Sequence, residues 1–302
     1  EGIAVGLSSK ILPHNFNELC EAAVSYLHGE EFHLYPDFQT GGSIDVSKYN
    51  DGERGGSVRV RSCIEKIDNK TLAIKEIPFG RTVANVCDSI VKASEKGKIK
   101  IRKVEDLTSG NVEILVHLAP GASSDKTIDA LYAFTDCEVS LSPNSCVIEN
   151  EKPRFASVSE ILRVSTENTV KLLKKELEIA LEELNEKWNW ISLERIFIKE
   201  GVYKKMEKCT SDQAIDDAIM KGLQPFVKNL IREVTIDDVH RLRKIPIDRI
   251  SKYNSDRADD TLIAIKDDIA AVQKDLDNLI DYAIAYFERI KNKYGKNRTR
   301  KT

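Results

Sequence analysis

The sequence lacks several features that would assign it to a common functional class. Its 302 residues contain no apolar run long enough to cross a bilayer, so we expect a protein without a membrane span. No Gly-x-x-x-x-Gly-Lys-[Ser/Thr] motif is present, nor any pair of carboxylates at a plausible metal-binding spacing. The sequence therefore predicts no nucleotide or metal site in this chain.

Cysteines are few, and none is spaced for a redox or zinc motif. The six are Cys20, Cys63, Cys87, Cys137, Cys146 and Cys209. No two form a Cys-x-x-Cys pair, and no His lies close enough in sequence to complete a zinc motif. We expect reduced, mostly buried thiols and a cytosolic location.

Aromatic residues are also scarce, at 7%, whereas charged residues make up 31%. This composition favours helices with much exposed surface. The charge is unevenly distributed, since residues 53–103 hold 13 Lys and Arg against 6 Asp and Glu, and residues 254–290 hold 4 against 9. The last twelve residues carry six cations and no acid. A basic first domain and a basic tail predict a polyanionic partner at one end of the molecule.

Local patterns in residues 15–151 predict an α+β domain. Asn15 can cap a helix that runs to about His28, with Glu18 completing a capping box. Residues 57–67 alternate as a strand does, and the dipeptide Asp68-Asn69 is expected to turn the chain into a second strand. Further helices are expected over residues 82–94 and 125–135, and further strands over 98–107 and 111–119.

Two helical rods are expected after this domain. Residues 157–199 contain no Gly or Pro, and apolar residues recur there at alternating spacings of four and three (Leu177, Leu181, Leu184, Trp188 and Ile191). A second run alternates three and four without a break (Leu262, Ile265, Ile269, Val272, Leu276, Leu279, Ala283, Tyr286 and Ile290). Such sustained seams are typical of coiled coils.

About sixty residues between the rods predict a small helical head. Asp212 and Pro225 are expected to begin two short helices, and Thr235 with Asp238 forms a capping-box start for a third. A chain that leaves along one helix and returns along another makes an antiparallel coiled coil with a globule at its tip.

Five motifs in this order resemble the A subunit of the bacterial type IIA DNA topoisomerases, topoisomerase IV and gyrase. The opening "GIAVGLSSKILPHN" is similar to the family's G-I-A-V-G-M-x-T-x-I-P-P-H-N, and "YPDFQTGG" to its G-P-D-F-P-T-G-G. "ERGGSVRVRS", "EIPF" and the tail "YGKNRTRKT" resemble its basic strand, its E-I-P-Y and its linker F-G-D-x-R-R-T. Gln39 stands where the family has proline.

The resemblance implies a division of the chain. Residues 1–14 would end a winged-helix/tower junction, 15–151 form an α+β tower domain, 152–200 the outgoing coiled-coil helix, 201–258 a helical dimer-gate head, 259–292 the returning helix, and 293–302 a basic linker to a C-terminal β-pinwheel. The family's catalytic tyrosine follows an arginine, and none of the nine tyrosines here does. We therefore expect a fragment that begins after the nucleophile, stops before the pinwheel and does not cleave DNA alone.

The resemblance also implies site residues. Ile3 matches the isoleucine that wedges between base pairs, although a core isoleucine is the alternative. Arg54, Arg59 and Arg61 would hold duplex phosphates, or merely form a soluble strand face, and Arg59 and Arg61 should share one face. Gly56 and Ser57 replace the family's usual lysine there. Three residues at a helix N-terminus, Lys10, His14 and Asn15, could bind an anion, with plain capping as the alternative for Asn15.

Partners follow from the same resemblance. Val239, Leu242, Ile245 and Ile250 would pack on a second copy of the head, unless they pack within one head. We expect double-stranded DNA, a homodimer, and an ATPase B subunit that completes an A2B2 holoenzyme and carries ATP and Mg²⁺, in the bacterial cytoplasm at the nucleoid. A scaffold with parallel rods and a stand-alone DNA-binding protein are the alternatives, and topoisomerase IV and gyrase are not distinguished.

Overall fold

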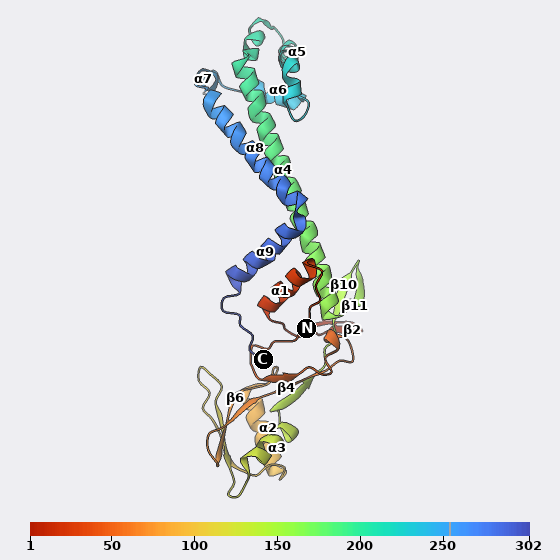
Figure 1. Ribbon diagram of the computed structural model, residues 1–302, viewed down its shortest axis with the longest axis vertical. Coiled ribbons are helices and arrows are strands. Elements are labelled where there is room, and N and C mark those ends of the chain that lie inside the picture. The colour runs from red at the N-terminus through yellow and green to blue at the C-terminus, as the bar shows by residue number, and fades with distance from the viewer. Residues whose placement is uncertain (254) are drawn as a thin grey trace. The chain divides into compact units, whose positions relative to one another are not determined.

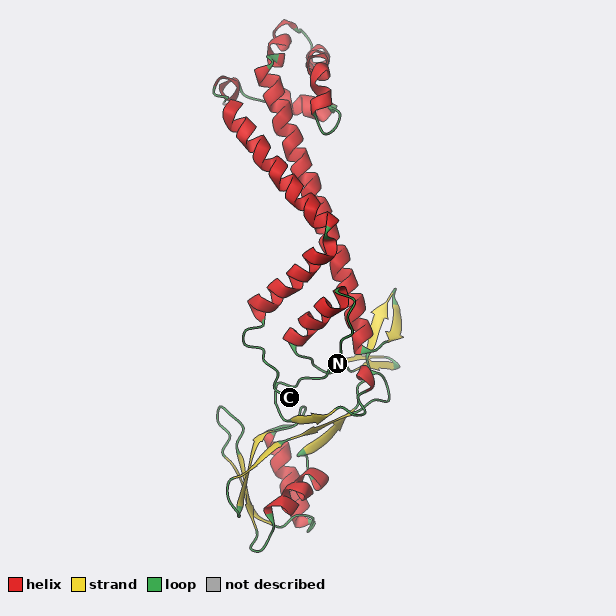
Figure 2. Ribbon diagram, viewed as in Figure 1, coloured by secondary structure: helices red, strands yellow, loops and turns green. Residues whose placement is uncertain are grey.

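The computed structural model describes residues 1–253 and 255–302, without the side chains of Ala4 and Lys208. It divides into two compact units, of which unit 1 comprises residues 1–168 and 284–302 and unit 2 comprises residues 169–283. Every strand of the described ranges lies in unit 1, whereas unit 2 is built from helices (Figure 1, Figure 2). The mixed class of the fold is therefore as predicted. None of the helices in the described ranges is long and apolar enough to span a membrane.

Unit 1 contains four small antiparallel sheets. Two are hairpins, β1-β2 and β10-β11, one has the order β3-β4-β9, and one the order β5-β6-β8-β7. The strands are β1 (Gly2–Ala4), β2 (Leu7–Ser9), β3 (Ser43–Asp45), β4 (Val58–Arg61), β5 (Cys63–Lys66), β6 (Thr71–Glu76), β7 (Ile101–Asp106), β8 (Ile114–Leu118), β9 (Glu138–Leu141), β10 (Cys146–Glu149) and β11 (Lys152–Phe155).

The four-stranded sheet carries the first core of unit 1. Helices α2 (Val83–Glu95) and α3 (Ser124–Phe134) cover one of its faces (Figure 1). Alternate residues of β8 point into this core, where Ile114 and Val116 are fully buried beside Ile90 of α2 and Leu131 of α3. Period-two burial on the strands meets the apolar stripes of the helices, as the sequence pattern predicts.

A second core lies under α1 (Phe16–Leu27) and the sheet β3-β4-β9. It joins Leu12 and Phe38 to the inward side chains of β4, Val58 and Val60, and to Val158 at the start of a long helix. The short 3-10 helix η1 (Asn50–Gly52) supports that start, because Asp51 accepts a 3.1 Å hydrogen bond from the amide of Ser159. The candidate interface residues of unit 1 are all carried by this region or by the chain that leads into it.

The predicted strand over residues 57–67 is divided at Ser62 into β4 and β5, which belong to different sheets. The Ser62 amide donates to the Cys137 carbonyl (2.8 Å), and the Ser62 carbonyl accepts from the Tyr132 hydroxyl (2.9 Å). Both main-chain groups are therefore occupied at the break. The other predicted elements of unit 1 appear within a few residues of their expected bounds, including the helix capped by Asn15.

Unit 2 contains most of α4 (Val158–Lys199) and all of α8 (Ser255–Asp277), which run in opposite directions (Figure 1). The ion pair between Arg195 and Asp259 joins them at 2.5 Å. Every residue of the predicted second seam is buried or half-buried. The helix is not continuous, however, since it breaks at Asn278 before α9 (Leu279–Tyr294). The Asn278 side-chain amide donates to the Lys274 carbonyl (2.8 Å), a local bond of the kind that competes with helix geometry.

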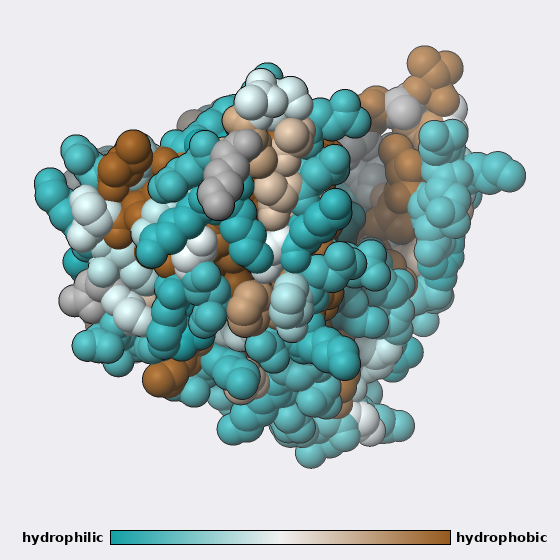
Figure 3. Space-filling model, turned by 90° about the horizontal axis from the view of Figure 1, so that it is seen from above, coloured by the Kyte–Doolittle hydropathy of each residue, from teal (hydrophilic) through white to brown (hydrophobic). Residues whose placement is uncertain are grey.

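Short helices complete the head of unit 2 and enclose a core of their own. They are η2 (Val202–Lys208), α5 (Asp212–Leu223), η3 (Gln224–Asn229), α6 (Ile236–Arg243) and α7 (Ile247–Ser251). The capping box of Thr235 and Asp238 is confirmed, but Ser211, and not Asp212, caps α5. On the face of the molecule seen in Figure 3, hydrophilic residues predominate and hydrophobic ones lie in small scattered groups.

Candidate nucleic-acid interface

The first hairpin of unit 1 presents an apolar side chain to solvent. Ile3 on β1 pairs with Ser8 on β2 and is 90% exposed. Val5 and Gly6 form the turn, where Gly6 has φ = +79°, a conformation that costs glycine little. Val5 is fully exposed as well. Ile3 is therefore not a core residue of the chain that the structure describes.

Contacts at the base of the hairpin hold it to β10. The Ser9 hydroxyl donates to the Cys146 carbonyl (2.8 Å), and Lys10 and Asn144 exchange two backbone hydrogen bonds of 2.9 and 3.0 Å. The Asn144 side chain also donates to the Ser8 carbonyl (2.7 Å). Sequence reasoning missed Ser9 and Asn144, because no local pattern links residues more than 130 positions apart.

Lys10 and His14 differ in their capacity to meet an anion. The Lys10 ammonium is partly exposed and lies 3.7 Å from the Glu1 carboxylate. His14 is half-buried, with its Nε2 3.0 Å from the Tyr49 hydroxyl. Burial lowers the pKa of His14, so the ring is neutral at pH 7 and brings no charge to a phosphate.

Asn15 caps α1, as predicted. Its Oδ1 accepts from the amides of Asn17 (2.9 Å) and Glu18 (3.4 Å), and its Nδ2 donates to Asp37 (2.9 Å) and to the Arg298 carbonyl (3.0 Å). The side chain is 5% exposed, so its polar atoms are engaged inside the protein. Glu18 does not close the predicted capping box, because its carboxylate accepts from Arg300 (2.6 Å).

The arginines of β4 share one outward face, as the alternation predicts. Each stands opposite an acid on a neighbouring strand: Arg59 is 2.5 Å from Asp45 of β3, and Arg61 pairs with Glu138 of β9. Hydrogen bonds from Ser47 and Arg59 hold the pKa of Asp45 well below its usual range, so the pair stays ionised at neutral pH. Arg54, in the loop before β4, is exposed.

The predicted dimer residues lie in the core of the head. Val239 and Leu242 are fully buried against Leu193 and Phe197 of α4, while Ile245 and Ile250 are partly buried beside the same core. Packing within one head, the alternative interpretation, accounts for Val239 and Leu242, because neither has surface to offer a second copy. His240 lies 3.4 Å from Asp216.

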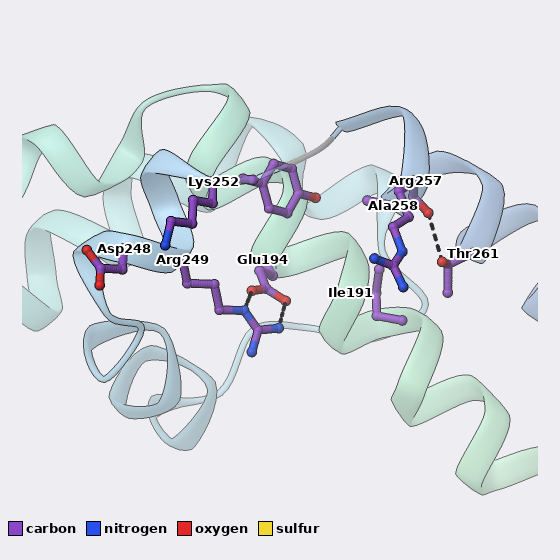
Figure 4. Close-up of a pocket in the computed structure, with 9 residues that line it drawn as sticks. Ile191, Glu194, Asp248, Arg249, Lys252, Arg257, Ala258 and Thr261 are labelled. Carbon is purple, nitrogen blue, oxygen red and sulfur yellow. Dashed lines mark hydrogen bonds and ion pairs between the residues drawn. The ribbon is translucent and has the colours of Figure 1, made fainter.

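A cavity of about 520 Å³ lies between α4, α7 and α8 of unit 2 (Figure 4). Its centre is an ion pair in which the buried Glu194 carboxylate meets the guanidinium of Arg249 at 2.5 and 2.8 Å. Burial raises the pKa of Tyr253, which also lines the cavity. The facing charges of Glu194 and Arg249 satisfy each other, so this cavity offers a partner no unpaired charge from either residue.

Comparisons with known proteins identify the family. A model that describes the A subunit of DNA gyrase/topoisomerase IV matches residues 1–288. The chain is 36% identical over all 302 residues to the DNA topoisomerase 4 A subunit of Borreliella burgdorferi, of which it covers 48%. It is 30% identical over 181 residues to the DNA gyrase A subunit of Lawsonia intracellularis, a match covering 53% of this chain and 22% of that protein. It is 21% identical over 320 residues to the DNA gyrase A subunit of Brachyspira hyodysenteriae, a match covering 98% of this chain and 37% of that protein.

The chain thus spans about half, or less, of the length of these relatives. The family match covers nearly all of the chain, and the Borreliella relative aligns with it from end to end. The chain belongs to the family of DNA gyrase and topoisomerase IV A subunits.

Proposed function

We propose that this chain is the DNA-binding tower, coiled-coil and dimer-gate portion of a type IIA topoisomerase A subunit. The observation that carries this proposal is the solvent-exposed Ile3, on a hairpin anchored at its base, in a chain that matches the family over residues 1–288. An apolar side chain inserted at a base step partly unstacks it and bends the duplex.

The face of β4 would hold the arms of the bent duplex without reading their sequence. Arg59 and Arg61 are about half exposed, and their acidic partners are also accessible to solvent. Exposed ion pairs contribute little to stability, so phosphate oxygens can replace Asp45 and Glu138 at small cost. Arg54 and Lys10 would add contacts beside this face, whereas Asn15 and His14 would act by supporting the loop that carries them.

Unit 2 would serve as the lever and the gate. Two long helices of opposite direction support an antiparallel coiled coil within one chain, in preference to a scaffold whose rods pair in parallel with a second copy. Two copies would meet through the head, with Ile245 and Ile250 near the contact and the exposed Ile247 in it. A homodimer of this kind would release a transported duplex when the heads separate.

The chemistry of strand passage would belong to other parts of the assembly. The nucleophilic tyrosine would precede this chain, which should not cleave DNA alone. ATP and Mg²⁺ would bind to the B subunit of an A2B2 holoenzyme in the bacterial cytoplasm. A stand-alone DNA-binding protein, the remaining alternative, would bind duplex tightly but would not support ATP-dependent strand passage with a B subunit.

The test uses the full-length A subunit reconstituted with its B subunit. Ile3→Ala should reduce DNA bending, measured by fluorescence transfer between the duplex ends, and should reduce DNA cleavage with it. Val5→Ala is the matched control, since Val5 is an equally exposed apolar residue of the same hairpin. Unchanged bending in Ile3→Ala would exclude the wedge, and absence of strand passage by the wild-type assembly would exclude the proposed function.

A further inference from the structure

The basic tail of the chain is held on unit 1 by a buried carboxylate. Asp37 is 2% exposed, and its Oδ1 accepts hydrogen bonds from the amides of Lys301 (2.9 Å) and Thr302 (3.0 Å). The Thr302 hydroxyl accepts from the Phe38 amide (2.8 Å) and donates to the Phe38 carbonyl (3.1 Å). Burial opposes ionisation of Asp37, but these amides and Asn15 outweigh it and hold its pKa below the ordinary value.

A second group of contacts holds the tail farther upstream. The Asn17 side-chain amide donates to the carbonyls of Gly295 and Arg298, both at 3.1 Å, and Asn15 donates to the Arg298 carbonyl. A Cβ at position 295 would clash with the Asn17 Oδ1 and lie 2.6 Å from the Lys291 carbonyl oxygen, so a larger residue there must displace the Asn17 side chain or the backbone. We call Asn15, Asn17, Asp37 and Phe38, with tail residues 295–302, the tail clasp.

The clasp binds mainly the backbone of the tail and needs few of its charges. Arg300 is used inward, since it pairs with Glu18 (2.6 Å) and donates to the Pro36 carbonyl (2.8 Å). The Arg298 guanidinium lies over the Phe16 ring, 4.9 Å from its centroid. Lys296 and Lys301 are exposed, and neither forms an ion pair with an acid of the described ranges. The contacts that hold the tail on unit 1 therefore do not use the charges of Lys296 and Lys301.

We infer that the tail, held in the clasp, is a second contact surface for the phosphates of duplex DNA, with Lys296 and Lys301 as its contact residues. The inference rests on the proposed DNA-binding function. Residues 295–302 carry four cations and no acid, which favours a polyanion, and a lysine ammonium binds phosphate as a point charge. A backbone already fixed by hydrogen bonds leaves less conformational entropy to be lost on binding than a free tail would. Phosphate contacts of this kind carry no base specificity.

The first test measures duplex binding by the 302-residue chain at several salt concentrations. The binding is measured by fluorescence anisotropy with a duplex of mixed sequence, about 30 bp long. In Lys296→Gln/Lys301→Gln, the negative slope of the log association constant against log salt should become shallower by about 2. Lys126→Gln/Lys221→Gln removes two exposed cations elsewhere and should leave the slope unchanged. If the tail variant keeps the wild-type slope, the inference is wrong.

The second test separates the clasp from simple electrostatics. Asp37→Asn removes a negative charge, which by itself would tighten DNA binding, but opening the clasp should weaken binding about as much as the tail variant does. Glu31→Gln, an exposed acid before the same loop, should bind as tightly as wild type or slightly more tightly. Gly295→Ala tests the clasp without changing charge, and amide hydrogen exchange of residues 296–302 reports its opening.

The two proposals fail in different ways. If Arg59→Gln/Arg61→Gln makes the salt dependence of DNA binding shallower and the tail variant does not, DNA binding by unit 1 is supported and the inference about the tail is wrong. If Asp37→Asn and Gly295→Ala release the tail yet bind as tightly as wild type, a mobile tail suffices and the clasp has no role in binding. If the wild-type chain binds no duplex at all, the failure lies with the proposed function.

Discussion

The first hairpin and the head helix α6 offer the same kind of residue in opposite settings. Ile3 and Leu242 are both apolar, and both stand in family-like motifs that imply contact with another molecule. Ile3 is 90% exposed on a two-stranded ribbon, whereas Leu242 is 1% exposed inside the core of the head. A motif therefore fixes where a residue stands in the chain, but its burial decides whether the residue can reach a partner.

Truncation of the two side chains should show the largest difference between the exposed and the buried residue. Leu242→Ala removes a fully buried side chain and should lower the free energy of unfolding by about 2–5 kcal/mol, through lost burial and a residual cavity. Ile3→Ala should leave stability within about 0.5 kcal/mol of wild type, because the side chain packs on nothing. Chemical denaturation followed by circular dichroism measures both, with Ile231→Ala, at an exposed apolar residue, as the control within the head.

A Leu242→Asp variant that no longer dimerises would not by itself locate the dimer interface, because a buried carboxylate at this position would unfold the head. Near-wild-type stability of Leu242→Ala would contradict the packing of α6 on α4. A clear loss of stability in Ile3→Ala would mean that the Ile3 side chain packs against another part of the chain, which would contradict its exposure.

The ion pairs of the two units also differ in burial, and we expect a smaller difference in stability from them. Arg232 donates to Glu186 of α4 and to Asp238, a buried carboxylate at the start of α6, at 2.6–3.1 Å. Arg232→Gln removes the cation from that carboxylate, which keeps its hydrogen bonds from Thr235, and should lower the free energy of unfolding by about 2 kcal/mol. Arg59→Gln breaks an exposed pair and should leave thermal stability unchanged, since such pairs are screened and weak.

Thermal unfolding with both variants in one buffer gives the direct comparison. The Arg232→Gln effect should persist in about 0.5 M salt, because one partner is buried, and salt sensitivity equal to that of an exposed pair would contradict this account.

Most local elements could be predicted from the sequence, because caps and apolar periods act over a few residues. Asn15, Thr235 and the seam of α8 are examples. The errors arose where distant residues decide. Ser62 splits one predicted strand because Cys137 and Tyr132 occupy its main-chain groups, and Asn278 breaks a seam whose apolar period continues across it.

The candidate site shows the same limit. The shared face of Arg59 and Arg61 follows from alternation alone, but their acidic partners come from strands paired through the folded sheet. The tail clasp joins Asp37 to residues more than 260 positions away, and no local pattern of the sequence predicts this contact. The spare charge of the tail was visible in the composition, whereas its fixed position was not.

The smallest expected effect concerns pH and compares the buried Asp37 with the exposed Asp45. The pKa of Asp37 is lowered in the folded state from an ordinary value of 3.8, so its contribution to the clasp is fully present above that value. It is lost as pH falls through the lower folded pKa, because a protonated carboxyl accepts the amides of Lys301 and Thr302 less strongly. Amide exchange of residues 296–302, corrected for intrinsic rates, should thus show constant protection from about pH 7 to 5 and a loss below 3.8. Asp45→Asn should not alter this profile, whereas Asp37→Asn should leave only the pH dependence that the Glu18–Arg300 ion pair contributes. A tail equally protected at every pH would mean that Thr302 and Asn17 hold it without Asp37.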